Sequence, residues 1–145
     1  MNDETMERKQ TSFWNGWLAR WGAHHFDNPA RRHKAAPFFD RLENLLRPAS
    51  VVLDLGAGTG FVTMECLADP RVARVIACDL SAEMLDHLQR KAEKRGFGER
   101  LELCCADAAS TGIEDDSVDV VVAYGMLHET ADCAAVIREA GRVLG

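Results

Sequence analysis

The stretch VVLDLGAGTGF, residues 51–61, decides the fold expected of this chain. Its first half is almost wholly aliphatic, which is typical of a parallel strand buried on both faces. Glycines then follow at alternate positions, Gly56, Gly58 and Gly60. Glycine lets the backbone turn sharply and approach a ligand closely. The next residues are compatible with a helix, for which Thr59 is a candidate cap. The stretch therefore predicts a strand, a ligand-binding turn and a helix, the arrangement in which open α/β sheets bind ligands at the carboxyl ends of their strands.

Three further segments predict strands that end beside polar residues. An apolar run within residues 71–79 ends at Asp79, and the amphipathic segment after it predicts a helix. Residues 101–105 alternate as a strand would, and Asp107 follows. The valine-rich run of residues 118–123 predicts a fourth strand, and residues 131–145 predict the helix after it. A carboxylate at the end of the second strand can accept hydrogen bonds from ribose hydroxyls.

The spacing of the glycines separates two cofactor classes. The dinucleotide fingerprint is G-x-G-x-x-G, whereas here Phe61 occupies the position of its third glycine. The G-x-G-x-G turn preceded by Asp54 resembles motif I of class I S-adenosylmethionine-dependent methyltransferases. The later segments match that family in order, and the resemblance is nearest to the small-molecule branch that includes ubiquinone and menaquinone biosynthesis enzymes. It implies an α/β fold, a Rossmann-like doubly wound parallel sheet with strand order 3-2-1-4.

The resemblance also implies the roles of individual residues. Asp79 would bind the ribose, Leu80 and Met84 would lie near the adenine, Asp107 would accept the adenine amino group, and the Ala108 N–H would meet a ring nitrogen. The remaining expected contacts to S-adenosyl-L-methionine are Asp54, Gly56, Ala57, Gly58, Gly60 and Tyr124. No metal site is expected.

Methyl transfer from a sulfonium is a direct displacement, so the protein mainly has to align the reacting groups. A general base is needed only where the acceptor must lose a proton. The expected catalytic residues are His128, which has a near-neutral pKa when unperturbed, and Tyr124. A His128 without a proton role is the alternative. For the whole chain, methyl transfer to a small-molecule acceptor is expected. The alternative is a catalytically silent module that binds S-adenosylmethionine or S-adenosylhomocysteine, or a partner subunit.

The C-terminus departs from the family pattern. The chain stops at Gly145, where the family continues into further strands. We therefore expect residues 49–145 to form a cofactor-binding domain that lacks its later strands. The fourth strand would then have an unpaired edge, which favours association. Partners expected on this basis are a second copy in a homodimer or a missing C-terminal segment.

Residues 1–48 are expected to form a helical cap over the cofactor domain. The three tryptophans, Trp14, Trp17 and Trp21, share one face of a first helix. They are a candidate lid over the substrate, and packing against the sheet is the alternative. A second helix should begin at Pro29 and be split or kinked by Pro37. Its inner face should hold Phe38, Phe39, Leu42, Leu45 and Leu46. The basic cluster at residues 31–34 is interpreted as a solvated helix face.

Composition limits the function classes. The net charge is −6, with 8 basic and 6 acidic residues up to position 50 and 9 basic and 17 acidic residues after it. An acidic cofactor domain argues against a nucleic-acid partner, which needs a basic surface. No apolar run is long enough for a membrane span, and the N-terminus does not resemble a signal peptide. These features predict a cytoplasmic protein, and the five cysteines are interpreted as reduced, packed thiols.

Overall fold

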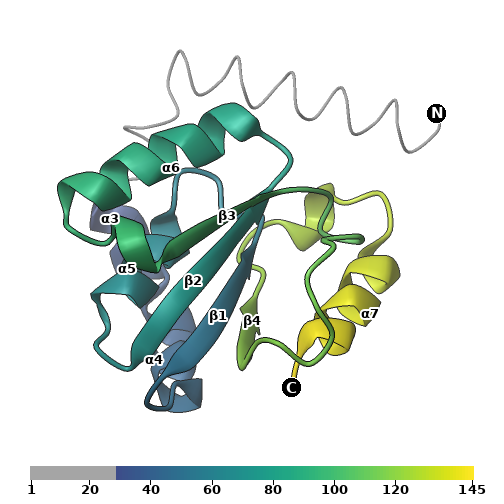
Figure 1. Ribbon diagram of the computed structural model, residues 1–145, viewed down its shortest axis with the longest axis horizontal. Helices are drawn as coiled ribbons and strands as arrows, with labels where there is room; N and C mark the ends of the chain where they lie inside the picture. Colours follow the sequence, from purple (N-terminus) through teal and green to yellow (C-terminus); the bar gives the residue numbers. More distant parts are fainter. Residues whose placement is uncertain (1–28) are drawn as a thin grey trace.

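The computed structural model describes residues 29–145. Helices precede the first strand and follow the first, second and fourth strands, whereas a loop joins the third strand to the fourth; short 3-10 turns precede the third strand and the last helix (Figure 1). In chain order these elements are α3 (Pro29–Lys34), α4 (Ala36–Leu45), β1 (Ser50–Leu55), α5 (Phe61–Ala68), β2 (Val72–Asp79), α6 (Ala82–Lys94), η2 (Gly98–Arg100), β3 (Leu101–Cys105), β4 (Val120–Val122), η3 (Leu127–Glu129) and α7 (Cys133–Val143). The strands and the helices after them lie where the sequence predicted them.

The four strands form one parallel sheet in the order β3-β2-β1-β4. Leu53 of β1 pairs with Ile76 of β2 on one side and with Val121 of β4 on the other. The predicted Rossmann-like order is therefore confirmed. Because all strands run in the same direction, their carboxyl ends meet at one edge of the sheet, where ligands bind in this class of fold.

The fourth strand is shorter than predicted. Val118 does not join the ladder with β1; its N–H donates to the carbonyl of Val143 at the end of α7, and it forms an isolated bridge with Leu144. Between this bridge and the strand, the Asp119 N–H donates to Val51, and the Asp119 carboxylate accepts the Val51 N–H at 2.8 Å. The valine run is thus divided between two backbone partners, which leaves only Val120–Val122 as regular strand.

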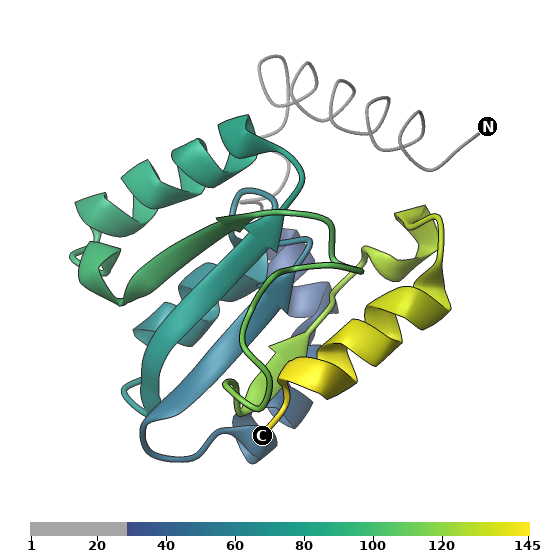
Figure 2. The ribbon, with the colours of Figure 1, turned by 45° about the vertical axis from the view of Figure 1, so that its right-hand side comes forward.

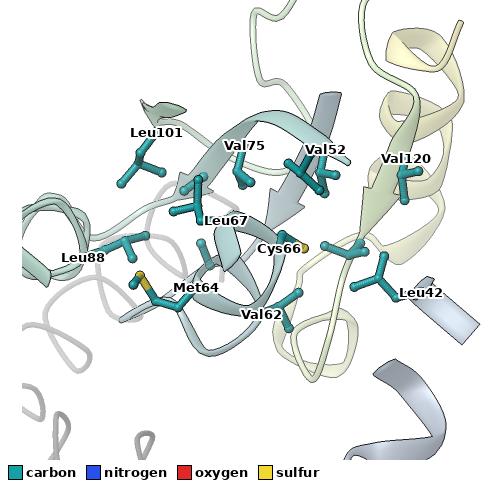
Figure 3. Packing of buried hydrophobic residues seen from close by; sticks show 14 of the residues in the cluster. Leu42, Val52, Val62, Met64, Cys66, Leu67, Val75, Leu88, Leu101 and Val120 are labelled. Atoms are coloured by element: carbon teal, nitrogen blue, oxygen red, sulfur yellow. The ribbon is translucent and has the colours of Figure 1, made fainter. Parts of the chain in front are cut away.

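Helices cover both faces of the sheet. Figure 2 shows α7 on one side of the sheet, opposite α4 and α5. On the α4, α5 and α6 side, aliphatic side chains from the helices pack against those of the strands (Figure 3). The residues labelled there are Leu42, Val52, Val62, Met64, Cys66, Leu67, Val75, Leu88, Leu101 and Val120. The α7 side has a smaller core around Leu53, Leu55, Ile76, Val136 and Val143. This double cover explains why β1 and β2 are almost continuously apolar.

The helices before β1 join the larger core. Pro37 lies in the first turn of α4, where proline is tolerated, and the helical conformation is interrupted at Ala35 between α3 and α4. The predicted split is therefore confirmed. Phe39 and Leu42 are buried as expected, but Leu45 is 61% exposed, so its assignment to the inner face was wrong. The tryptophan face and the predicted first helix lie outside the described residues, and the boundary at residue 48 remains a prediction.

Among residues 29–145, the structure contains no helix whose length and apolarity would let it cross a bilayer. All five cysteines are free thiols.

Candidate active site

A cavity of about 330 Å³ opens at the carboxyl edge of the sheet. It is bounded by the turn after β1, the ends of β2 and β4, the loop after β3 and the start of α7. Of the residues that the sequence predicted for the site, those lining the cavity are Asp54, Gly56, Ala57, Gly58, Asp79, Leu80, Met84, Asp107, Ala108 and Tyr124. Gly60 and His128 do not line it. The topology thus brings together residues that are separated by up to 70 positions in the chain.

The glycine turn is fixed by hydrogen bonds to β2. The N–H groups of Gly56 and Ala57 donate to the carbonyl of Cys78 at 2.9 and 3.0 Å. Gly56 and Gly58 have φ values of 71° and 57°, a region that glycine enters without strain. A Cβ on Gly58 would meet only the Met84 sulfur, at 3.8 Å. The turn therefore presents backbone at the cavity wall, with room for a ligand to approach it.

Asp79 closes the end of β2 and holds the turn in place. One carboxylate oxygen accepts the Gly58 N–H at 2.9 Å, and the other accepts the Ser81 N–H at 2.9 Å. Burial raises the pKa of this carboxyl, and the same N–H donors oppose the rise. Each carboxylate oxygen has a second lone-pair site. Asp79 can therefore accept hydroxyl groups of a ligand without giving up its bonds to the turn.

Thr59 and Gly60, at the end of the glycine turn, have different roles in the structure. Gly60, rather than Thr59, is the N-cap of α5, and no side chain caps this helix, so the expected capping role of Thr59 was wrong. The Thr59 hydroxyl is buried, lines the cavity and has no hydrogen-bond partner within residues 29–145. A buried hydroxyl without a partner is costly, so Thr59 is a binding candidate that sequence reasoning missed.

Asp54 lies below the turn, with a side chain that is almost wholly inaccessible. Its carboxylate accepts the Thr63 hydroxyl at 2.7 Å. Burial raises the pKa of Asp54 to about 7, because the ionised form is poorly solvated there, and the Thr63 hydrogen bond partly offsets this. A cationic ligand beside Asp54 would favour the ionised form.

A second set of hydrogen bonds fixes the loop that carries Asp107 and Ala108. The Asp107 carboxylate accepts the Ala109 N–H at 2.8 Å. Further along the loop, Thr111 donates both its N–H and its hydroxyl to Glu139 of α7, at 3.0 and 2.7 Å. Glu139 is also paired with Arg142, and together these donors lower its pKa to about 2. The loop at the β3 end of the cavity is thus attached to α7.

Residues 124–132 form the rim on the opposite side. Tyr124 and Glu129 line the cavity, as does Met126, whose Cβ lies 2.7 Å from where a Cβ on Gly56 would be. Burial raises the pKa of Glu129. His128 points away from the cavity lining: 71% of its side chain is exposed, and its Nε2 lies 3.6 Å from the Glu129 carboxylate. Its predicted catalytic role remains a prediction, and Glu129 has the more favourable position for a proton acceptor.

The cavity lining is mainly acidic. Five carboxyl groups line it, those of Asp54, Asp79, Asp107, Glu129 and Asp132. Arg31 supplies the single Lys or Arg side chain among the described lining residues. Arg31 was expected on a solvated helix face, but the structure places its guanidinium against the Phe61 ring at the cavity wall, which corrects that interpretation. An acidic cavity with one cation suits a ligand whose overall charge is positive.

Comparison with known proteins agrees with this geometry. Residues 52–145 match the family described as methyltransferase domain. The chain belongs to this family, as its motifs predicted, and S-adenosylmethionine is the cofactor of the family.

Individual relatives cover several acceptors. The chain is 38% identical to malonyl-[acyl-carrier protein] O-methyltransferase of Halorhodospira halophila, over 72% of this chain and 36% of that protein. It is 33% identical to tRNA 5-carboxymethoxyuridine methyltransferase of Escherichia coli, over 64% of this chain and 35% of the relative. The chain thus spans about a third of the length of these relatives. A methyltransferase from Thiobacillus denitrificans, solved with S-adenosylhomocysteine, has the same fold at a TM-score of 0.68 and 24% identity, covering 92% of this chain and 51% of that one.

The residues present fit this cofactor. Asp79 can accept further hydrogen bonds, Gly58 presents its backbone to the cavity, and the Thr59 hydroxyl has no partner within residues 29–145. These are the polar groups that a nucleoside requires. The acidic lining matches a sulfonium and an ammonium.

Proposed function

We propose that this chain binds S-adenosylmethionine in the cavity and supports transfer of its methyl group to a small-molecule acceptor by direct displacement. The observation that carries the proposal is the position of Asp79: it is anchored to the glycine turn through Gly58 and faces the cavity. Asp107 and Ala108 lie on the β3 side, where the adenine is expected, and Tyr124 lies on the β4 side. The cofactor brings an activated methyl group, so the residues of the chain have mainly to hold and align the two reactants.

A small acceptor is favoured by the charge and shape of the site. The cavity has a volume of about 330 Å³ and is lined by five carboxyl groups, which would repel a polyanion. The named relatives act on an acyl-carrier protein and on a tRNA, so the acceptor class is the part of this proposal that most needs a direct test. Where the acceptor must lose a proton, Glu129 is the group that we expect to receive it, because it faces the cavity.

Calorimetric titration with S-adenosylhomocysteine tests the cofactor site. Wild-type protein should bind with micromolar affinity. Asp79→Asn should weaken binding by at least tenfold, because the ribose loses an ionised acceptor. Asp86→Asn is the matched control, since Asp86 is an exposed carboxylate on α6 that pairs with Arg90. Equal binding by Asp79→Asn and wild type would contradict the site.

The second candidate function is a binding module without turnover. It is favoured by the exposed position of His128, because the predicted proton acceptor does not reach the cavity. Transfer of a labelled methyl group from S-adenosylmethionine to small molecules of a metabolite extract distinguishes the two functions. Binding with no labelled product would favour the module.

A further inference from the structure

The connection between β3 and β4 carries Asp107 and Ala108 and passes beside α7 (Figure 2). Its residues 106–117 form neither helix nor strand, so contacts with neighbouring elements have to hold it in place. The first anchor is made of backbone: the Ala106 N–H donates to the carbonyl of Asp79 at the end of β2, at 3.2 Å. This end of the connection is therefore fixed to the sheet.

The second anchor is Glu139 of α7. Its Oε1 accepts the Thr111 N–H at 3.0 Å and the Thr111 hydroxyl at 2.7 Å. The same hydroxyl accepts the Ile113 N–H at 3.2 Å, which extends the anchor along the loop. The Cys104 thiol, a weak donor, adds a contact of 3.4 Å to the Thr111 carbonyl. Thr111 is only 7% exposed, so without Glu139 its two donors would be left with little water to replace the lost acceptor.

Glu139 is itself held in one orientation. Arg142, one turn further along α7, donates its Nε–H to Oε2 at 2.9 Å and an Nη2–H to Oε1 at 2.6 Å. Two parallel bonds of this kind fix the plane of a carboxylate. Arg142 also pairs with Asp115, near the far end of the connection. The carboxylate therefore fixes Thr111 relative to α7 rather than following it.

The residues expected to meet the adenine lie between these two anchors. Asp107 and Ala108 line the cavity, and the Asp107 carboxylate accepts the Ala109 N–H at 2.8 Å. This bond fixes the shape of the turn, whereas the two anchors fix its position. Since α7 contributes Ala135 and Val136 to the cavity lining, the second anchor also sets the spacing between the turn and this part of the wall.

We propose that Glu139 is a positioning residue for adenine recognition: through Thr111 it holds the turn where the Asp107 carboxylate and the Ala108 N–H can both meet the edge of the base. This inference rests on the proposed function, because it takes the ligand of the cavity to be an adenine nucleoside. Hydrogen bonds weaken steeply when their geometry is lost. A turn released from α7 should therefore bind the nucleoside with less selectivity for its base.

Calorimetric titration with two ligands tests this role. S-adenosylhomocysteine presents an amino donor and an unprotonated ring nitrogen, whereas S-inosylhomocysteine presents a carbonyl and a ring N–H at the same two positions. The ratio of the two affinities measures how well the turn recognises the base. A variant that only lowers the folded fraction weakens both ligands equally and leaves this ratio unchanged.

The variants are Glu139→Ala and Glu139→Gln, whose amide oxygen can still accept from Thr111. Glu102→Ala is the matched control, because it removes the same charge from an exposed pair with Arg74 on the sheet. We expect wild type and the control to prefer S-adenosylhomocysteine by at least about tenfold, Glu139→Ala by less than about threefold, and Glu139→Gln by an intermediate factor. If Glu139→Ala does not fold, Thr111→Val, which removes one of the two donors, gives the same comparison with α7 intact.

An affinity ratio in Glu139→Ala equal to that of wild type would overturn the proposal, even if both affinities fell. Equal binding of the two ligands by wild type would also overturn it, because the turn would then not recognise the base, while the cofactor site would stand. If wild type binds neither ligand, the proposed function fails, and this inference fails with it.

Discussion

Gly60 is the glycine at which we expect an added side chain to destabilise the fold most. Its φ is +94°, and a Cβ there would lie 2.1 Å from Cδ1 of Leu88 on α6. Leu88 is fully buried, so its methyl group cannot move into solvent. Gly60→Ala therefore incurs two costs, a strained backbone of about 1–2 kcal/mol and overpacking of about 1–3 kcal/mol. The free energy of unfolding should fall by roughly 2–5 kcal/mol.

Gly112→Ala separates the two costs. Gly112 also has a positive φ, +73°, but a Cβ there would meet nothing within 4 Å. Gly112→Ala should therefore lower the free energy of unfolding only through backbone strain, by about 1–2 kcal/mol. Urea unfolding of both variants, followed by circular dichroism, gives the difference. Leu88→Ala provides a further check, because removing the clashing methyl should reduce the cost of Gly60→Ala in the double variant. Equal destabilisation by Gly60→Ala and Gly112→Ala would refute the packing argument.

Two further predictions concern carboxyl groups. Burial raises the pKa of Asp54 to about 7 in the folded state, against an ordinary value of 3.8. The folded state therefore holds a proton that the unfolded state releases, and the free energy of unfolding should fall as the pH rises from about 4 to 7, by up to roughly 4 kcal/mol. Asp54→Asn should remove this decline in urea unfolding measured across that range, and an unchanged decline would contradict the assignment. The pH dependence expected from Glu139 is the opposite, because its pKa is lowered to about 2. Its contribution to the free energy of unfolding is present above pH 4.5 and is lost as the pH falls through 2. Glu139→Gln should cost about 1–3 kcal/mol at pH 7, whereas Glu102→Gln, in an exposed pair with Arg74, should cost less than about 1 kcal/mol.

The central strands could be predicted because local sequence and tertiary burial agree there. Residues of β1 and β2 are covered on both faces, so a continuous aliphatic run in the sequence was enough to predict each strand. At the edges this agreement weakens. Leu103 of β3 is 38% exposed although it lies in an apparently regular alternation. The valine run at β4 overestimates the strand, since a backbone partner from the end of α7 replaces β1 at Val118.

The cavity lining was predictable where a residue ends or follows a strand, as Asp79 and Asp107 do. Arg31 was missed because it stands in a basic cluster on a short helix, and its contact with Phe61 at the cavity wall joins residues that are distant in the sequence. No sequence pattern indicates that the Thr59 hydroxyl lacks a partner in the part of the chain that the structure describes. The bond between Thr111 and Glu139 joins residues 28 positions apart, with no local pattern to indicate it.

The acidic lining has a consequence for the end of a catalytic cycle. A sulfonium loses its positive charge when its methyl group leaves, so the spent cofactor is a neutral thioether at that atom. The carboxyl groups of Asp79, Asp107 and Asp132 line the cavity whichever form of the cofactor is bound. They attract the donor more strongly than the spent cofactor. The fixed charges of the cavity would therefore reduce product inhibition and speed exchange of spent for fresh donor, without any movement of the protein.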